Sequence, residues 1–167
     1  MESGYKSEDI SIPSVDQVGI VVKDLDDGMD RFSAILGLDS WVVFRFEPPK
    51  LKNTTYQGEE VDYTFRAGLA NIGSFQIELV EPLEGESAYT NHLKTYGEGL
   101  HHIVCFSFDD PHNAVNEYKN AGVPLLQQAE FGDGEFWYLD TRDVMNGTIL
   151  EIVDVANDEP DRVYNLD

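Results

Sequence analysis

Three apolar stretches of the sequence carry ionisable side chains where apolar ones are expected. Glu78 lies within residues 75–82, Glu151 lies within residues 147–153, and His101 and His102 begin an apolar run that ends at Asp109. An ionised carboxylate among buried apolar neighbours is costly unless a positive group compensates it. One imidazole and two carboxylates suit a borderline or hard divalent cation, namely Zn, Co, Ni, Mn or Fe.

The stretch around His102 occurs twice in the chain. A shift of 85 residues places Gln17 under His102, Asp24 under Asp109 and Gly37 under Gly122. Successive side chains of a strand point to opposite faces, so only one of the two histidines can join an inward-facing cluster. We expect this to be His102, with His101 either structural or facing the rim.

The repeat therefore supplies a fourth donor, the amide oxygen of Gln17. The predicted metal ligands are Gln17, Glu78, His102 and Glu151. A cation with open positions can polarise a substrate oxygen. Glu151 is the first candidate for the base that moves a proton, and Glu78 is the second.

Each half of the chain has the pattern of a strand, a helix and three strands. In the first half we expect strands at 15–22, 41–46, 61–67 and 75–80, a helix from Asp24 to Gly37 that buries Met29, Phe32, Ile35 and Leu36, and a long loop at 47–60. In the second half we expect strands at 100–108, 124–128, 135–139 and 148–153 and a helix at 111–121.

These elements predict an α+β fold. Two βαβββ modules, residues 14–83 and 97–154, would form one domain, 14–154, with a linker helix at 87–96. Neither module can bury both faces of its sheet alone, so we expect one cupped mixed sheet with a central metal site and the helices outside. Residues 1–13 are predicted to be a flexible arm, and residues 155–167 an acidic tail that frays or lies across a neighbour.

The charge of the chain limits its partners. The 167 residues include 32 acidic and 11 basic ones, a formal net charge of -21. Such a surface repels phosphate backbones and anionic lipids, so we expect neither nucleic-acid nor membrane partners. It also suggests a protein adapted to concentrated salt. No N-terminal apolar segment resembles a signal peptide, which makes the cytoplasm the expected location.

Several segments resemble a known superfamily. Residues 16–25 (DQVGIVVKDL) are similar to the opening strand of the vicinal oxygen chelate proteins, which include glyoxalase I, methylmalonyl-CoA epimerase, extradiol dioxygenases and bleomycin-resistance proteins. Residues 77–83 (IELVEPL) and 97–103 (GEGLHHI) are most similar to the methylmalonyl-CoA epimerases and related glyoxalase-like proteins. The resemblance implies paired βαβββ modules and one metal held by Gln17, Glu78, His102 and Glu151.

Two departures from the epimerase pattern leave the activity open. Epimerases usually have histidine where this chain has Gln17, and glutamine there resembles the eukaryotic type of glyoxalase I. The resemblance also implies a second acid near the third strand, where only Asp62 is present. An extradiol dioxygenase is disfavoured because one of its two inward histidines is missing.

The leading hypothesis is a metal-dependent isomerase or epimerase, similar to methylmalonyl-CoA epimerase, that abstracts a proton next to a carbonyl. The alternatives are a glyoxalase I-like lyase and a non-catalytic binding protein like the bleomycin-resistance relatives. The expected partners are a small substrate with adjacent oxygens and a second copy of the chain, in a homodimer. A CoA ester requires cationic contacts, for which the candidates are Arg45, Lys50, Lys52, Arg66 and Arg142.

Overall fold

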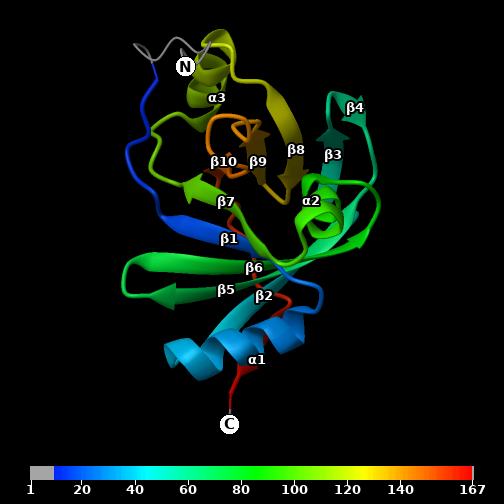
Figure 1. The fold of residues 1–167 in the computed structure, drawn as a ribbon, viewed down its shortest axis with the longest axis vertical. Coiled ribbons are helices and arrows are strands. Elements are labelled where there is room, and N and C mark those ends of the chain that lie inside the picture. The colour runs from blue at the N-terminus through cyan, green and yellow to red at the C-terminus, as the bar shows by residue number, and fades with distance from the viewer. Residues whose placement is uncertain (1–9, 167) are drawn as a thin grey trace.

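The computed structural model describes residues 10–166, so most of the predicted arm at 1–13 lies outside the described residues. Within 10–166 the chain forms one mixed sheet in the order β11-β2-β5-β6-β1-β7-β10-β9-β8-β3-β4, with three helices (Figure 1). The strands are β1 (Gln17–Val21), β2 (Ser40–Phe46), β3 (Leu51–Tyr56), β4 (Glu59–Glu60), β5 (Thr64–Ile72), β6 (Phe75–Glu84), β7 (Gly99–Cys105), β8 (Leu125–Phe131), β9 (Gly134–Leu139), β10 (Ile149–Asp154) and β11 (Arg162–Asn165); the helices are α1 (Leu25–Leu36), α2 (Ala88–Tyr96) and α3 (Pro111–Asn120).

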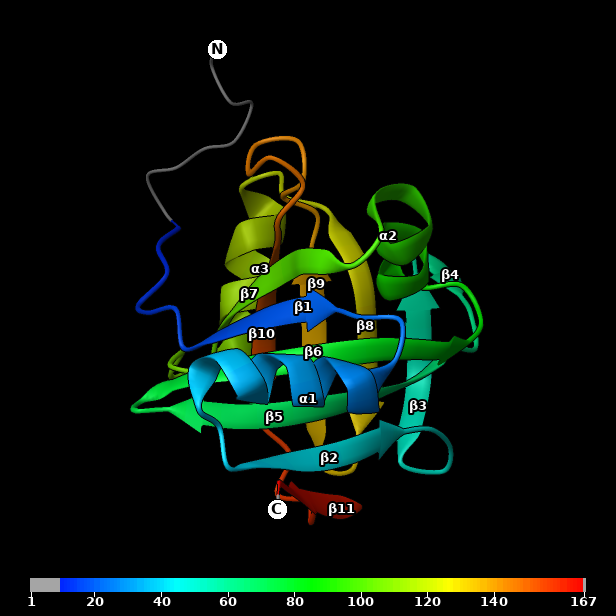
Figure 2. The ribbon, with the colours of Figure 1, turned by 60° about the horizontal axis from the view of Figure 1, so that its bottom comes forward.

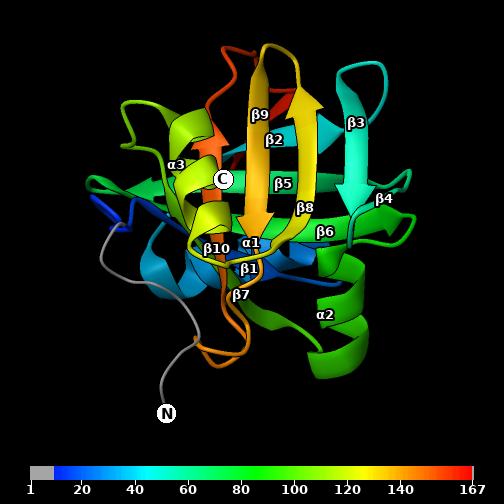
Figure 3. The ribbon, with the colours of Figure 1, turned by 90° about the horizontal axis from the view of Figure 1, so that it is seen from above.

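The two predicted modules are related by the pairing of their first strands. β1 pairs in parallel with β6, β7 pairs in parallel with β10, and β1 and β7 join the halves in antiparallel fashion. The sheet curls at this junction, so that β8, β9 and β10 run across the direction of β2, β5 and β6 (Figures 2 and 3). The expected α+β fold of two modules in a cupped mixed sheet is confirmed.

The helices lie outside the cup and cover separate apolar clusters. α1 begins after the N-cap Asp24 and packs Leu25 and Met29 against β5 and β6. α3 begins after the N-cap Asp110 and packs Ala114 and Val115 against β9 and β10. A third cluster fills the space between the two halves of the sheet, where Phe65, Tyr89, Phe131 and Phe136 are buried. No helix in residues 10–166 is long and apolar enough to cross a membrane.

Two details of the fold differ from the expectations. The loop predicted at 47–60 is wrong, because β3 and β4 form a hairpin there and β3 pairs with β8 of the second module. The predicted buried face of α1 is also partly wrong, since Ile35 is 85% exposed and Leu36 is 44% exposed. Ile35 lies off the face that runs through Leu25, Gly28, Met29 and Ser33.

The segment predicted as an acidic tail crosses a neighbouring element. β11 pairs with β2 in antiparallel fashion, and Tyr164 donates a hydrogen bond to Asp30 of α1 at 2.7 Å. Arg162 pairs with Asp26 at the start of α1. Of the two arrangements considered for this segment, fraying and lying across a neighbour, residues 162–165 adopt the second.

Candidate metal centre and its cavity

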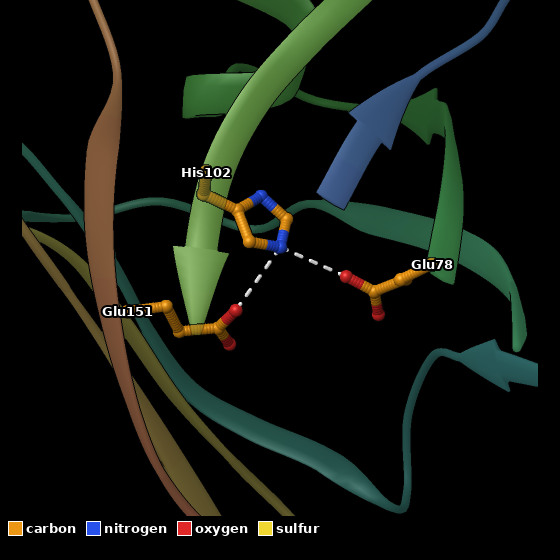
Figure 4. A group of neighbouring side chains, drawn as sticks. All are labelled: Glu78, His102 and Glu151. Carbon is orange, nitrogen blue, oxygen red and sulfur yellow. Dashed lines mark hydrogen bonds and ion pairs between the residues drawn. The ribbon is translucent and has the colours of Figure 1, made fainter. Parts of the chain in front are cut away.

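An imidazole lies between two carboxylates in the cup. His102 of β7 places Nε2 2.9 Å from Oε2 of Glu78 on β6 and 3.1 Å from Oε2 of Glu151 on β10 (Figure 4). One ligand atom from each residue lies within 4.8 Å of the other two. The second oxygen of each carboxylate is turned away from the ring (Figure 4). A single chain thus brings together three of the four residues predicted to bind a metal.

The strand register relates the fourth residue to these three. Glu78 is opposite Gly19, two residues after Gln17, and Glu151 is opposite Val104, two residues after His102. Gln17 therefore occupies in the first module the position that His102 occupies in the second. Its side chain is buried and lines the same cavity as Glu78 and Glu151, with Nε2 donating to Gln76 at 2.5 Å. Ligation by Gln17 stays a prediction.

Gly19 makes room for the imidazole of His102, and the sequence analysis did not predict this role. A Cβ at this position would lie 1.9 Å from Cε1 and 2.0 Å from Nε2 of His102. The ring of His102 therefore lies directly over the backbone of β1. The signal was present in the sequence, because a glycine inside an apolar strand often marks a close approach by another group.

The spacing of the three side chains fits a divalent cation. In an octahedral site with ligands about 2.1 Å from the cation, neighbouring ligands are separated by about 3 Å. The observed separations of 2.9 Å and 3.1 Å from His102 Nε2 match this value. The donors are one nitrogen and carboxylate oxygens, which suit zinc and the first-row transition metals. The residues present therefore fit a bound divalent metal.

The protonation states also indicate a site suited to a cation. Burial alone would lower the pKa of His102, but the adjacent Glu151 and Glu78 raise it to about 9. Burial raises the pKa of Glu151 to about 7, against the opposing effect of His102. Without a cation, His102 thus holds a proton at neutral pH, and the charge of this imidazolium balances the adjacent carboxylates of Glu78 and Glu151.

His101 supports His102 from behind. Both rings are fully buried, and their Nδ1 atoms are 2.9 Å apart, so of the two expected roles of His101 the structural one fits and the rim-facing one does not. Burial lowers the pKa of His101 well below its usual value, which keeps the ring neutral and able to accept a hydrogen bond. When His102 Nε2 offers a lone pair to a cation, Nδ1 of His102 carries the proton and donates a hydrogen bond to Nδ1 of His101.

A hydroxyl pair lies beside Glu151. Tyr138 is directly opposite Glu151 across the β9–β10 pair, and its hydroxyl is 2.6 Å from that of Tyr89 on α2. Both tyrosines are fully buried, and burial raises the pKa of each well above its usual value. They therefore remain neutral hydrogen-bonding groups. Nothing in the residue pattern separates Tyr138 from the aromatic core residues around it.

The carboxylates face an aromatic cavity of about 260 Å³. Its polar lining near the site comes from Gln17, Gln76, Glu78 and Glu151, and Val155 and Ala156 line it where the chain leaves β10. Five phenylalanines complete the walls: Phe44, Phe46, Phe106, Phe131 and Phe136. Such a cavity can accept a small molecule with an apolar body and oxygens directed at the metal ligands.

Two other groups considered from the sequence lie away from this cavity. Asp62 is exposed between β4 and β5 and lines two other pockets with Asn53 and Thr54. No arginine or lysine in residues 10–166 lines the cavity. The five cations considered as CoA contacts all form ion pairs with acids: Arg45 with Glu47, Lys50 with Asp158, Lys52 with Glu130, Arg66 with Asp26 and Glu81, and Arg142 with Asp140.

Comparison with known proteins gives relatives of the same fold. The chain is 23% identical over 147 residues to an uncharacterized protein of Bacillus subtilis, covering 87% of this chain and 94% of the relative. A hypothetical protein of Bacillus halodurans has a TM-score of 0.64 at 22% identity, covering 87% and 96% of the two chains. The methylmalonyl-CoA epimerase of Mycobacterium tuberculosis has a TM-score of 0.58 at 22% identity, covering 87% and 89%.

A solved structure of methylmalonyl-CoA epimerase in complex with methylmalonyl-CoA and NH4+ is similar at a TM-score of 0.59 and 24% identity, covering 90% of this chain and 99% of the other. These identities establish a shared fold only. The family model of the glyoxalase/bleomycin resistance protein/dioxygenase superfamily matches residues 16–138, which include the first strands of both modules, Glu78 and His102. Taken with the paired modules, this match shows that the chain belongs to the glyoxalase/bleomycin resistance protein/dioxygenase superfamily.

Proposed function

We propose that the protein is a metal-dependent epimerase or isomerase that removes and returns a proton on a carbon next to a carbonyl. The observation that carries this proposal is the position of His102 between Glu78 and Glu151 at an aromatic cavity. Gln17, Glu78, His102 and Glu151 would hold the cation, which would supply Lewis-acid polarisation of the substrate carbonyl.

The proton transfer itself is assigned to side chains of the site. The Glu151 oxygen that is turned away from His102 can take the proton from the substrate carbon and return it (Figure 4). Glu78 comes from the other module and is the second candidate for this role. The phenylalanines give the site apolar walls, which strengthen the electrostatic interactions inside it.

Two other functions are supported by particular features. A glyoxalase I-like lyase is favoured by Gln17, since glutamine at that position resembles the eukaryotic type of that enzyme. A non-catalytic binding protein, like the bleomycin-resistance relatives, would use the same aromatic cavity without needing the four ligands. Metal content separates the binding protein from both enzymes.

The test begins with metal analysis of the purified protein, where we expect about one divalent ion per chain. Deuterium wash-in from heavy water is then followed by mass spectrometry with methylmalonyl-CoA and with uncharged α-hydroxy ketones. We expect exchange with at least one substrate, loss of exchange on chelation and recovery when the metal is added back. Metal-loaded protein that exchanges none of these protons would contradict the proposal.

A pair of variants assigns the base. Glu151→Gln keeps an oxygen donor and the shape of the side chain but cannot take a proton, so exchange should stop while the circular dichroism spectrum stays unchanged. Glu130→Gln makes the same chemical change on β8, where Glu130 pairs with Lys52 and Asn53 outside the cavity, and should keep full activity. An active Glu151→Gln protein would place the base elsewhere.

A further inference from the structure

We propose that the substrate of this site is a small uncharged compound with an aromatic body and two adjacent oxygens, such as an aromatic α-hydroxy ketone, and that the site does not accept CoA esters. The inference rests on the proposed function and specifies its substrate. It follows from the lining of the cavity, which combines five phenylalanines with charged residues of a single sign.

All charged residues that line the cavity are acidic. Besides the two ligand carboxylates these are Glu135, Asp154 and Asp158. A divalent cation would balance Glu78 and Glu151, and Lys50 pairs with Asp158 at 2.8 Å. Glu135 and Asp154, which are opposite each other on β9 and β10, are compensated by no arginine or lysine of this lining, and Glu135 lies 3.9 Å from Nε2 of His112 on α3. An anion entering this cavity therefore meets a net negative potential even when the metal is bound.

The cations of the neighbourhood are not available to a ligand. Lys50 lies beside the cavity wall, with its Nζ 5.9 Å from the ring centre of Phe131, but it is paired with Asp158. A CoA ester carries phosphate groups that need several basic contacts. Binding one here would require these ion pairs to break, and the freed acids would then repel the phosphates.

The walls favour an aromatic body. Phe46 stacks on Phe65 with ring centres 4.2 Å apart and contacts Phe131 at 4.3 Å, so the wall is a packed aromatic surface. Offset or edge-to-face contact with these rings stabilises another aromatic ring. At about 260 Å³ the cavity is slightly smaller than a typical drug-sized site of about 300 Å³ or more, so the ligand has to be small.

The test is calorimetric titration of the metal-loaded protein with three probes. They are 2-hydroxyacetophenone, which is uncharged, mandelate, which has the same aromatic ring and a carboxylate, and methylmalonyl-CoA. We expect 2-hydroxyacetophenone to bind about tenfold or more tightly than mandelate and methylmalonyl-CoA to show no saturable binding. Equal or tighter binding of either anion overturns the proposal.

Two pairs of variants test separately the charge of the cavity lining and its aromatic wall. Val155→Lys places a cation at a 63% exposed position of the cavity lining and should tighten mandelate binding, whereas Val144→Lys, 46% exposed and outside the lining, should not. Phe44→Leu removes a ring from the wall and should weaken 2-hydroxyacetophenone binding about fivefold or more. Phe32→Leu removes a ring beneath α1 and should leave it unchanged. A Val155→Lys protein that binds mandelate no better than the Val144→Lys protein also overturns the proposal.

Failure of this inference differs from failure of the proposed function. Titration reports binding and deuterium wash-in reports proton exchange, so a protein that prefers 2-hydroxyacetophenone but exchanges no proton keeps the ligand class and loses the epimerase activity. A protein that exchanges the proton of methylmalonyl-CoA keeps the epimerase activity and loses the ligand class.

Discussion

Replacing Gly19 with alanine should displace His102 and abolish metal binding. The added Cβ would lie 1.9 Å from Cε1 of His102, and ordinary contact begins near 3.4 Å, so the ring has to retreat by about 1.5 Å. Metal–ligand distances tolerate only about 0.2 Å. His101 and Tyr138 lie against the ring, and the side chain is fully buried, so it cannot simply rotate to a new position.

The expected magnitudes follow from these contacts. Loss of the His102 ligand should weaken metal binding about 100-fold or more. The extra methyl group should also lower the free energy of unfolding by about 1–3 kcal/mol, the usual cost of overpacking a core. The assay is competition for the metal against a chromogenic chelator, with urea unfolding of the metal-free protein measured in parallel.

Gly68→Ala is the matched control. Gly68 is another buried strand glycine of the first module, and its added Cβ would meet the flexible side chain of Met29 at 2.9 Å without reaching any predicted ligand. This variant should lose stability but keep its metal affinity. A folded Gly19→Ala protein with unchanged metal affinity would refute the placement of the metal at His102.

Four further predictions concern the proton on His102, the tyrosine pair and salt. Because a cation competes with the proton held by His102, whose pKa is raised to about 9, the metal dissociation constant should fall about tenfold per pH unit from pH 7 to 9 in chelator competition. For the same reason the metal-free protein, whose native state holds this proton more tightly than the unfolded chain does, should lose stability in urea as pH rises from 7 to 9, by about 2 kcal/mol. Tyr89→Phe removes a buried 2.6 Å hydrogen bond to Tyr138 and should cost about 1–2 kcal/mol in urea unfolding with no change in metal affinity. The net charge of -21 predicts a melting temperature that rises with KCl, and full stability in dilute buffer would remove the hypothesis of adaptation to concentrated salt.

The internal repeat made the centre of this fold predictable. One shift relates Gln17 to His102, and the structure places Glu78 and Glu151 at the same distance along the neighbouring parallel strands of the two modules. Apolar neighbours around each glutamate were enough to indicate burial, because an ionised side chain in such a run needs a partner. These signals are local and strong, so a single sequence revealed them.

The predictions that the structure did not confirm depend on contacts between residues far apart in the sequence. The sequence predicts a loop at 47–60 because this stretch is irregular and contains two prolines, Asn53, Thr54, Thr55 and Gly58. In the structure β3 is a strand there, paired with β8 far along the chain. The sequence also does not show whether Lys50 is free to bind a ligand. This depends on its ion pair with Asp158, a residue of the segment that follows β10. That pairing has a consequence for function, because a cation held by an acid contributes little to anion binding. Sequence similarity to epimerases therefore predicts the fold and the clustering of Glu78, His102 and Glu151 more reliably than the substrate, which depends on such pairings around the cavity.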